Sequence, residues 1–221
     1  MVTTIRLSIC NVFLIQGKRP VLVDTGRPKD FPVIVKALRR HGVELNDLSL
    51  ILHTHGHWDH CGSTAQLREH TSAHIAIHRA DAPMMRQGHN GVLTPRNLTA
   101  RVFKPIMDLS YTGTEPTHLI DGETDLAEYG VAAKALETPG HTSGSMSVLT
   151  SDGEIIVGDL LMGGFWGGRL LRGRPSLHYF AEDLDILKRS IRKVLDLAPK
   201  RIHTSHGGPL DPGRVARFLG W

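Results

Sequence analysis

Short apolar runs alternate with amphipathic stretches along the whole chain, and turn-forming residues separate them. Alternating or continuous apolar residues predict strands over residues 11–15, 21–24, 49–52, 74–78, 117–120, 131–136, 145–149 and 154–157. Helical apolar spacing predicts helices over residues 31–41, 63–70, 80–87 and 184–197. Strands that alternate with helices are typical of an α/β fold in which helices cover β-sheets.

The composition of the chain fits one domain without a membrane span. The 221 residues are 40% hydrophobic, and no linker, low-complexity tract or apolar run of about 18 residues interrupts them. We therefore expect a single domain over residues 1–221 that has no membrane partner. Only two cysteines, and a polar rather than apolar N-terminus, predict a reducing, cytoplasmic location.

The net charge of +4 invites a nucleic-acid function, but the sequence does not support one. Basic pairs such as Arg39-Arg40 and Lys188-Arg189 lie in segments of helical spacing, where a solvated cationic face is the usual explanation. Aromatic residues make up only 5% of the chain, too few to predict a surface on which bases stack. Nucleic acid is therefore not an expected partner, and the composition does not indicate an oligomeric state.

Four histidines and one aspartate crowd into eight residues directly after a predicted strand, in the sequence HTHGHWDH from His53 to His60. Imidazoles this close repel one another when protonated, whereas neutral imidazole and carboxylate are ligands that zinc and iron prefer. In α/β folds, ligand sites lie on turns at the carboxyl ends of strands. The stretch therefore predicts a metal-binding loop. A structural zinc site is less favoured, since such sites usually contain cysteine ligands.

The spacing within this loop favours two metals. His55 and His57 alternate by two residues, while the neighbouring Asp59 and His60 must point in different directions. One tetrahedral ion could hardly bind all four side chains without strain, and a pair of ions roughly 3.5–4 Å apart is common in hydrolases. His53 precedes the turn, and we expect it to pack or hydrogen-bond near the site without ligating.

The loop resembles the T-H-x-H-x-D-H signature of the metallo-β-lactamase-fold hydrolases, and other segments resemble further motifs of that family in the same order. The family's T-P-G-H-T turn corresponds to residues 138–142, its strand-end G-D pair to residues 158–159 and its closing G-H-G segment to residues 203–208. Asp24-Thr25-Gly26 resembles the family's D-T-G turn near the site floor. The resemblance implies a four-layer αββα sandwich, with two mixed β-sheets flanked by helices.

The resemblance also implies the metal ligands and the nucleophile. Two groups of three residues would each hold one metal, with one residue bridging both: His55, His57 and His141; Asp59, His60 and His206; and the bridging Asp159. We expect two divalent ions, Zn²⁺ first and Fe or Mn as alternatives, because imidazole and carboxylate serve all three. A hydroxide shared between the metals would be the nucleophile, since a bound divalent ion lowers the pKa of water to about 7.

The same motifs narrow the expected activity. The second histidine of the H-x-H pattern argues against the flavodiiron proteins, and aspartate at position 159 argues against the common β-lactamases. What remains resembles glyoxalase-II-type thioesterases and acyl-homoserine-lactone lactonases. We therefore expect a metal-dependent hydrolase of a small-molecule acyl substrate, a thioester or a lactone. Asp59 would be essential for turnover, and Tyr179 or His178 would assist by hydrogen bonding to the developing oxyanion.

Two segments, residues 88–116 and 163–179, fit neither a core strand nor a core helix. The second is rich in Gly and Arg and follows Asp159 closely, so it could fold over the metals and select the substrate. An irregular surface connector explains it equally well. The expected contacts are an apolar wall from two aromatic residues and an anion site from three arginines: Phe165, Trp166, Arg169, Arg172 and Arg174.

Three alternative functions stay open. The same metals and hydroxide could cleave a phosphodiester, since they can attack phosphorus as well as carbon. A single iron could support a sulfur dioxygenase. The fold and its metals could also persist in a binding protein that has lost useful turnover.

Overall fold

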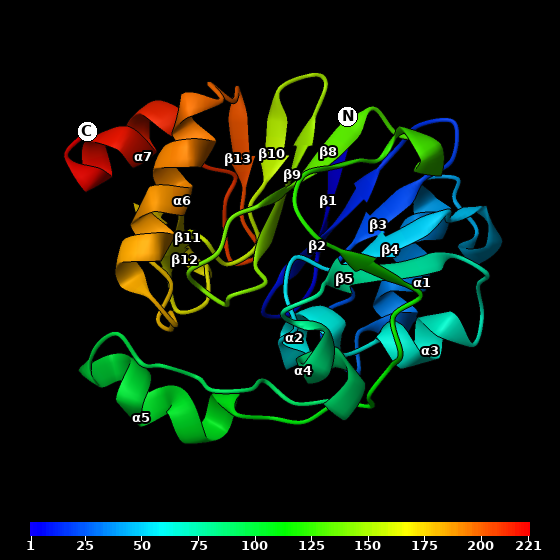
Figure 1. Cartoon of the computed structure of the whole chain (residues 1–221), viewed down its shortest axis with the longest axis horizontal. Helices are drawn as coiled ribbons and strands as arrows, with labels where there is room; N and C mark the ends of the chain where they lie inside the picture. Colours follow the sequence, from blue (N-terminus) through cyan, green and yellow to red (C-terminus); the bar gives the residue numbers. More distant parts are fainter.

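The first β-sheet contains six strands, and their order in space follows the chain from β1 to β6. In the computed structural model, which describes residues 1–221, they are β1 (Val2–Arg6), β2 (Asn11–Ile15), β3 (Val21–Val23), β4 (Leu50–Leu52), β5 (His74–His78) and β6 (His118–Ile120). β1, β2 and β3 pair antiparallel, whereas β3, β4, β5 and β6 pair parallel. The sheet is therefore mixed, and the carboxyl ends of its parallel strands lie on one side (Figure 1).

The second sheet contains five strands in the order β13-β10-β9-β8-β7. These are β7 (Thr124–Asp125), β8 (Ala133–Glu137), β9 (Met146–Thr150), β10 (Glu154–Ile156) and β13 (Arg201–His203). Only β10 and β13 pair parallel, so this sheet is also mixed. A separate hairpin consists of β11 (Met162–Phe165) and β12 (Leu170–Ser176).

Alternation along β2 explains why both faces of the first sheet are buried. Phe13 and Ile15 face the second sheet and belong to the core between the sheets, whereas Val12 and Leu14 pack on the opposite face. Successive strand residues point to opposite faces, so a continuous apolar run is typical of a strand that is covered on both sides. Val148 of β9 contributes to the same inner core from the second sheet.

Helices cover the outer face of each sheet (Figure 1). The principal ones are α1 (Phe31–Arg40), α3 (Thr64–Arg68), α6 (Leu184–Asp196) and α7 (Pro212–Leu219). Ile34 of α1 and Leu67 of α3 pack on the first sheet, and Leu187 of α6 and Val215 of α7 pack on the second. The expected four-layer αββα sandwich is therefore confirmed. The shorter helices are α2 (Trp58–Cys61), α4 (Ala82–Gln87), and the 3-10 turns η1 (Leu45–Asp47) and η2 (Ala127–Tyr129).

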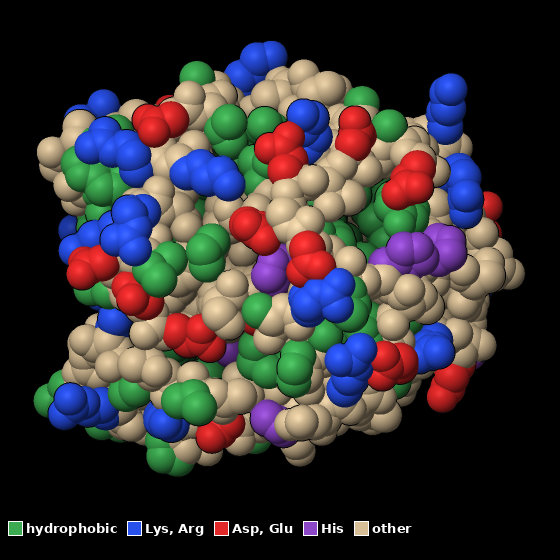
Figure 2. Space-filling model, in the orientation of Figure 1, with side chains coloured by type: hydrophobic (Ala, Val, Ile, Leu, Met, Phe, Trp, Pro, Cys, Tyr) green, Lys and Arg blue, Asp and Glu red, His purple; other side chains and the backbone are tan.

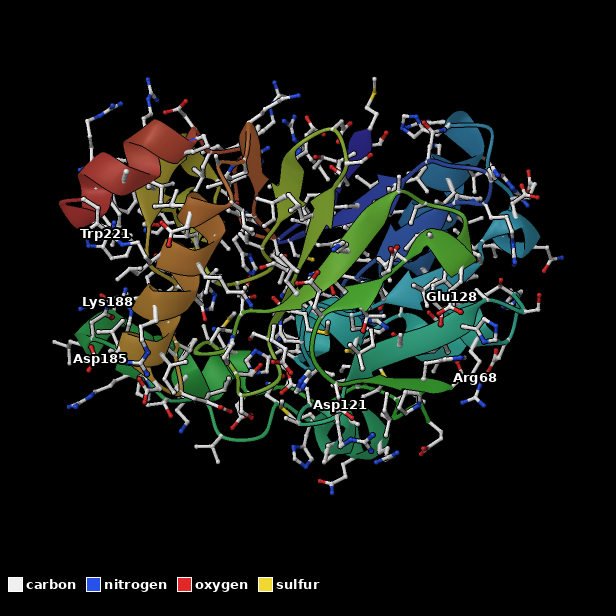
Figure 3. The ribbon with its side chains drawn as sticks, turned by 45° about the horizontal axis from the view of Figure 1, so that its top comes forward. Arg68, Asp121, Glu128, Asp185, Lys188 and Trp221 are labelled. Carbon is white, nitrogen blue, oxygen red and sulfur yellow. The ribbon has the colours of Figure 1, made fainter.

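α6 illustrates how the sequence pattern places a helix. The Asp183 carboxylate caps its N-terminus by accepting hydrogen bonds from the backbone N–H groups of Asp185 and Ile186, at 2.9 and 2.8 Å. Its apolar residues pack on the sheet, while Asp185 and Lys188 lie on the other side of the helix (Figure 3). α6 is 13 residues long, and no helix of the structure is both long and apolar enough to cross a bilayer.

The predicted strands and helices lie within two residues of their observed bounds, but the apolar pattern missed several elements. β1 is an edge strand in which only Val2 and Ile5 are buried, so its sequence shows little periodicity. The two segments that fit no core element are also ordered. Residues 88–116 contain α5 (Leu98–Met107), and residues 163–179 contain most of the β11–β12 hairpin.

α5 contacts the rest of the molecule through a narrow face. It lies apart from the other helices in Figure 1, along the lower edge, where Figure 2 shows hydrophobic side chains at the surface. Leu98 and Val102 are 75% and 69% exposed, whereas Ala100 is buried against Leu93 and Phe180. Most of the apolar side chains of α5 therefore face solvent instead of the body of the molecule.

Candidate metal centre

The predicted ligands follow strands of both sheets at the points where those strands end. In the first sheet, β4 ends at Leu52 and continues directly into the His53–His60 loop. In the second sheet, Asp159 follows β10, His206 follows β13, and His141 lies in the turn between β8 and β9. These strand ends lie on the same side of the sandwich, so loops that are distant in sequence lie together there.

Three imidazole nitrogens converge in one part of the site. His55 Nε2 and His141 Nε2 each lie 3.1 Å from His57 Nδ1. All three residues are buried, and their rings meet edge-on with centroids 4.6 to 4.8 Å apart. Three nitrogen donors around one point are a suitable ligand set for a divalent ion that keeps an open position.

A second group of donors lies beside the first. Asp59 Oδ2 lies 3.4 Å from His206 Nε2, and Asp59 Oδ1 lies 3.9 Å from His60 Nε2. Asp159 lies between the groups, because its Oδ2 is 3.5 Å from both His60 Nε2 and His141 Nε2. Its Oδ1 is 3.4 Å from His206 Nε2. The structure thus brings all seven predicted ligands together, with Asp159 in contact with both groups.

Unpaired buried atoms indicate that this cluster suits cations. His60 Nε2, His206 Nε2 and Asp159 Oδ1 are buried without a hydrogen-bond partner, although neighbouring ligand atoms lie 3.4 to 3.5 Å away. An unsatisfied buried polar atom costs about 1–3 kcal/mol, and native proteins rarely leave several in one place. Divalent cations would satisfy all three atoms, so the residues present fit a two-metal centre.

The other ring nitrogen of three of these histidines is hydrogen-bonded to the surrounding protein. Each Nδ1 lies 2.8 to 3.0 Å from an acceptor oxygen: Asp24 Oδ2 for His60, the Ile9 carbonyl for His206 and the Phe180 carbonyl for His141. Carboxylate and carbonyl oxygens only accept, so Nδ1 carries a proton and donates it. Nε2 is therefore the nitrogen that can bind a metal, and the ring is already turned towards the centre.

Asp24 orients the metal-binding loop as well as His60. Its carboxylate accepts hydrogen bonds from the Thr54 backbone N–H and from Thr54 Oγ1, both at 2.8 Å. Asp24 is fully buried and has a φ of 63°, in the left-handed region. His53 Nδ1 lies 3.9 Å from this carboxylate, and His53 Nε2 lies 3.2 Å from Thr64 Oγ1. His53 is thus near the site but outside both donor groups, as the sequence predicted.

We expect Asp24→Asn to weaken metal binding by about 10- to 100-fold without unfolding the protein. Asparagine has the same shape and tolerates the left-handed backbone, but it loses the charge and one acceptor that hold His60 and Thr54. Competition with a fluorescent zinc chelator measures the affinity. Asp196→Asn, at an exposed position at the end of α6, is the matched control. Unchanged affinity in Asp24→Asn would show that this carboxylate does not support the ligands.

Asp81 connects the two loops that carry the first donor group, and the sequence analysis missed it. Its Oδ2 accepts hydrogen bonds from Gly56 N–H at 3.0 Å and Thr142 Oγ1 at 2.7 Å, and its Oδ1 accepts one from Gly144 N–H at 2.9 Å. The one signal in the sequence is its position before α4, which is typical of a helix cap. The side chain makes no cap hydrogen bond and turns towards the loops instead.

Burial and nearby charge shift the pKa values of the predicted ligand histidines in two different directions. Burial lowers the pKa of His55, His57 and His141, so these imidazoles are neutral at neutral pH, the form that binds metals. Burial acts in the same direction on His206, but attraction to the Asp159 carboxylate outweighs it and raises the pKa to about 10. Without metal, His206 therefore carries a positive charge.

Metal binding is expected to release protons at neutral pH. Burial opposes the charged form of His60 too, but Asp159 and Asp24 raise its pKa well above the usual range, so both His60 and His206 are protonated without metal. Coordination needs the lone pair, so these two histidines should release about two protons when two cations bind, and ionisation of a metal-bound water would add about one more. Affinity should therefore rise with pH towards 10 and fall in acid. Isothermal titration calorimetry in buffers of different ionisation enthalpy counts the protons, and release of one or none would contradict this charge distribution.

A narrow cavity opens onto the donor cluster. Its inner end and its largely apolar wall are formed by His57, Asp59, Asp159, His178, Trp58, Asn90, Leu93, Met107 and Phe180. A larger hollow of about 470 Å³ lies beside residues 16–20 and 41–43, near the start of β3 and so at the opposite end of that strand. That hollow contains no cluster of metal donors, so we assign function to the narrow cavity.

Residues 88–116, called the strap below, contribute to this cavity. Asn90 Oδ1 accepts a hydrogen bond from the Trp58 backbone N–H at 2.9 Å. The Arg96 backbone N–H donates to the Tyr179 carbonyl at 2.9 Å, and Arg96 Nε donates to the His178 carbonyl at 2.6 Å. The strap and the end of the 163–179 segment, the two segments singled out in the sequence, therefore meet beside the cluster.

The predicted substrate contacts lie on the β11–β12 hairpin and do not line the narrow cavity. Phe165 and Trp166 are 39% and 72% exposed, and the Arg174 guanidinium lies 5.4 Å from the centre of the Phe165 ring. Arg169 and Arg172 line a separate small hollow. The role of these five residues in substrate binding stays a prediction.

Of the two residues predicted to assist catalysis, only His178 lines the cavity. His178 Nε2 lies 3.2 Å from Asp159 Oδ2. The Tyr179 side chain is half-buried and packs with Leu93 and Phe180 beside α5. The structure therefore brings His178, but not Tyr179, to the donor cluster.

Comparisons with known proteins agree with this site. The family model of the metallo-beta-lactamase superfamily matches residues 5–206. The Bacillus subtilis protein named "Probable metallo-hydrolase YflN" is 29% identical over an alignment of 229 positions, which covers 92% of this chain and 83% of that protein. The "Hydroxyacylglutathione hydrolase" of Anaeromyxobacter dehalogenans is 32% identical over 155 positions, 70% of this chain and 46% of that enzyme.

Solved structures show the same fold. The di-iron-bound form of TTHA1623 is 26% identical, has a TM-score of 0.68, and the match covers 98% of this chain and 97% of that one. The Rm3 metallo-beta-lactamase is 21% identical with a TM-score of 0.69, over 92% of this chain and 74% of that one. The relatives named as hydrolases and the buried donor cluster support a metal-dependent hydrolase. Since the family model spans nearly the whole chain, this protein belongs to the metallo-beta-lactamase superfamily.

Proposed function

We propose that the protein is a dinuclear metal-dependent hydrolase that cleaves a small-molecule thioester, with a lactone as the nearest alternative. The observation that carries the proposal is the position of Asp159 in contact with two groups of buried donors. The thioester is preferred because two relatives are named hydroxyacylglutathione hydrolases, and an acylated glutathione is a thioester. The chain aligns with about half of each of those enzymes, so their substrate is proposed here only as a chemical class.

The proposed cofactor is a pair of divalent cations, one at each donor group. Bound there, they would ionise a water molecule at neutral pH and polarise the carbonyl oxygen of the substrate. Zinc is our first choice, and the di-iron-bound neighbour makes iron the principal alternative, because imidazole and carboxylate suit both.

The chain's own residues orient these donors and shield the reacting carbonyl. Asp59 and Asp159 bring negative charge into a buried site, which lowers the electrostatic cost of holding two cations there. Trp58, Leu93 and Phe180 line the cavity that leads to them, so an acyl group would displace water from apolar surface as it enters.

The lining of the cavity and the set of donors argue against two of the alternative functions. No lysine or arginine lines it, whereas binding of a nucleic-acid phosphodiester depends on such cations. The two donor groups also exceed what a single iron would need.

A cytoplasmic location belongs to the same proposal, because Cys10 and Cys61 are free thiols, as expected in a reducing compartment.

A substrate panel tests the proposal. Protein purified without added metal is assayed by elemental analysis and then with a thioester, a lactone and bis(p-nitrophenyl) phosphate. We expect about two metal ions per chain and a kcat/KM for the thioester at least about tenfold above that for the phosphodiester. A higher kcat/KM for the phosphodiester would overturn the proposed thioester hydrolysis and make phosphodiester cleavage the function. Two bound metals without turnover of any compound would indicate a binding protein, and oxygen consumption with a persulfide would indicate a dioxygenase.

A further inference from the structure

We infer that His178 is a metal ligand, an eighth donor beyond the seven residues of the family motifs, at a position that it shares with His141 and Asp159. The inference rests on the two-metal part of the proposed function and not on the identity of the substrate. All three residues are buried, and their donor atoms lie within 4.8 Å of one another.

The distances around Asp159 fit a shared cation. Its Oδ2 lies 3.2 Å from His178 Nε2 and 3.5 Å from His141 Nε2. With His178 the ion would have five protein donors, and two ligands that are each roughly 2.0–2.1 Å from a five-coordinate zinc ion stand roughly 2.9–3.6 Å apart at angles of about 90–120°. The rings of His178 and His141 meet at 90° with centroids 4.6 Å apart, so the two donors approach the carboxylate oxygen from different directions.

The Phe180 carbonyl lies within reach of Nδ1 of both His141 and His178. It lies 3.0 Å from His141 Nδ1 and 3.3 Å from His178 Nδ1. Because a carbonyl only accepts hydrogen bonds, both rings can donate Nδ1–H to it and leave Nε2 free for a metal. One backbone group would thus fix the orientation of two neighbouring imidazoles.

The opposite tautomer would give His178 a different role. The Phe180 backbone N–H also lies 3.3 Å from His178 Nδ1, and in that case Nε2–H would donate a hydrogen bond to Asp159. His178 would then be a positioning residue that acts through Asp159. The two roles make different predictions for a side chain that can donate a hydrogen bond but binds metals poorly.

The backbone of His178 is held firmly beside the cluster. Arg96 donates hydrogen bonds to the carbonyls of His178 and Leu177, at 2.6 and 3.1 Å. The His178 ring stacks on His206, with planes 29° apart and centroids separated by 5.5 Å. A donor held in advance loses little freedom on binding, which favours ligation. If His178 ligates, its Nε2 is not available to the oxyanion, so this role replaces the one predicted from the sequence.

The decisive experiment compares the metal affinity and Co²⁺ spectrum of His178→Ala with those of His178→Gln. The control is His74→Ala, which changes an exposed histidine at the start of β5. A ligand role predicts that both variants weaken binding of one of the two cations by at least about tenfold and shift the visible spectrum of the Co²⁺-substituted protein. Glutamine can still donate a hydrogen bond to Asp159. A His178→Gln protein with unaltered affinity and spectrum would therefore assign the positioning role and overturn the inference. A His178→Ala protein with unaltered affinity and spectrum would overturn the inference equally. Circular dichroism of the metal-free variants checks their folding.

A measurement on the unaltered protein keeps the test independent of substitutions. In the Co²⁺-substituted protein, each ligating histidine contributes one hyperfine-shifted, exchangeable N–H proton signal. The inference predicts six such signals, because His178 joins the five histidines of the two donor groups. Five signals would overturn it. A protein that binds two cations but hydrolyses no thioester would refute the proposed substrate alone, whereas one that binds no cation would overturn both proposals.

Discussion

Replacing Asp159 by asparagine is expected to lower thioester hydrolysis by more than about a thousandfold and to reduce the content of both metals. Loss of one hydrogen-bond donor to a reacting oxygen already costs about 10²–10³-fold. Asp159 does more, because its Oδ2 lies 3.5 Å from a histidine of each donor group. Asparagine keeps the shape but removes the charge between the two cations, and it turns an N–H₂ group towards atoms that should face a metal.

The measurement combines elemental analysis with kcat/KM for the best thioester in the panel. Asp196→Asn is the control, because it makes the same chemical change at an exposed position at the end of α6. If Asp159→Asn binds metal fully at both donor groups and keeps activity within tenfold of the unaltered protein, Asp159 is not a ligand of either metal.

Asp59→Ala is expected to have the second-largest effect, and its signature in metal content differs. Asp59 belongs to one donor group only, through contacts with His206 and His60. The three-histidine group stays complete, so the variant should retain about one metal per chain and lose turnover by at least about 10²-fold. Titration with Zn²⁺ while activity is followed measures both quantities. Full activity in a correctly folded Asp59→Ala protein would refute the two-metal assignment.

The metal-binding loop could be predicted from the spacing of its residues alone, because several metal-ligating residue types are close together in the sequence. His55, His57, Asp59 and His60 lie in one short loop, whereas the ligand roles of His141, Asp159 and His206 were implied only by the family resemblance. Such spacings can be read without knowing what packs beside them. The same applies to the central strands, since continuous apolar runs such as residues 11–15 are what a strand buried on both faces requires.

The residues that support the ligands could not be located in this way. Asp81 looks like a helix cap, and only the fold shows that its carboxylate joins the loops of His57 and His141. Phe180 acts through its carbonyl, which no side-chain pattern can indicate. α5 has helical apolar spacing, but its apolar side chains Leu98, Val102 and Ile106 are exposed, and most of β12 is exposed, so neither segment could be predicted as a core element.

Each donor group combines residues from both halves of the sandwich. The loop from His55 to His60 extends from the first sheet, whereas His141, Asp159 and His206 extend from the second. Elsewhere the inner faces of the two sheets meet mainly through apolar side chains. Cations bound between the halves would act as cross-links, so resistance to heat would depend on the supply of free metal. A tenfold rise in free metal adds about 1.4 kcal/mol for each bound ion once its concentration is well above the Kd. Starvation for metal would thus lower the stability of the fold as well as the activity.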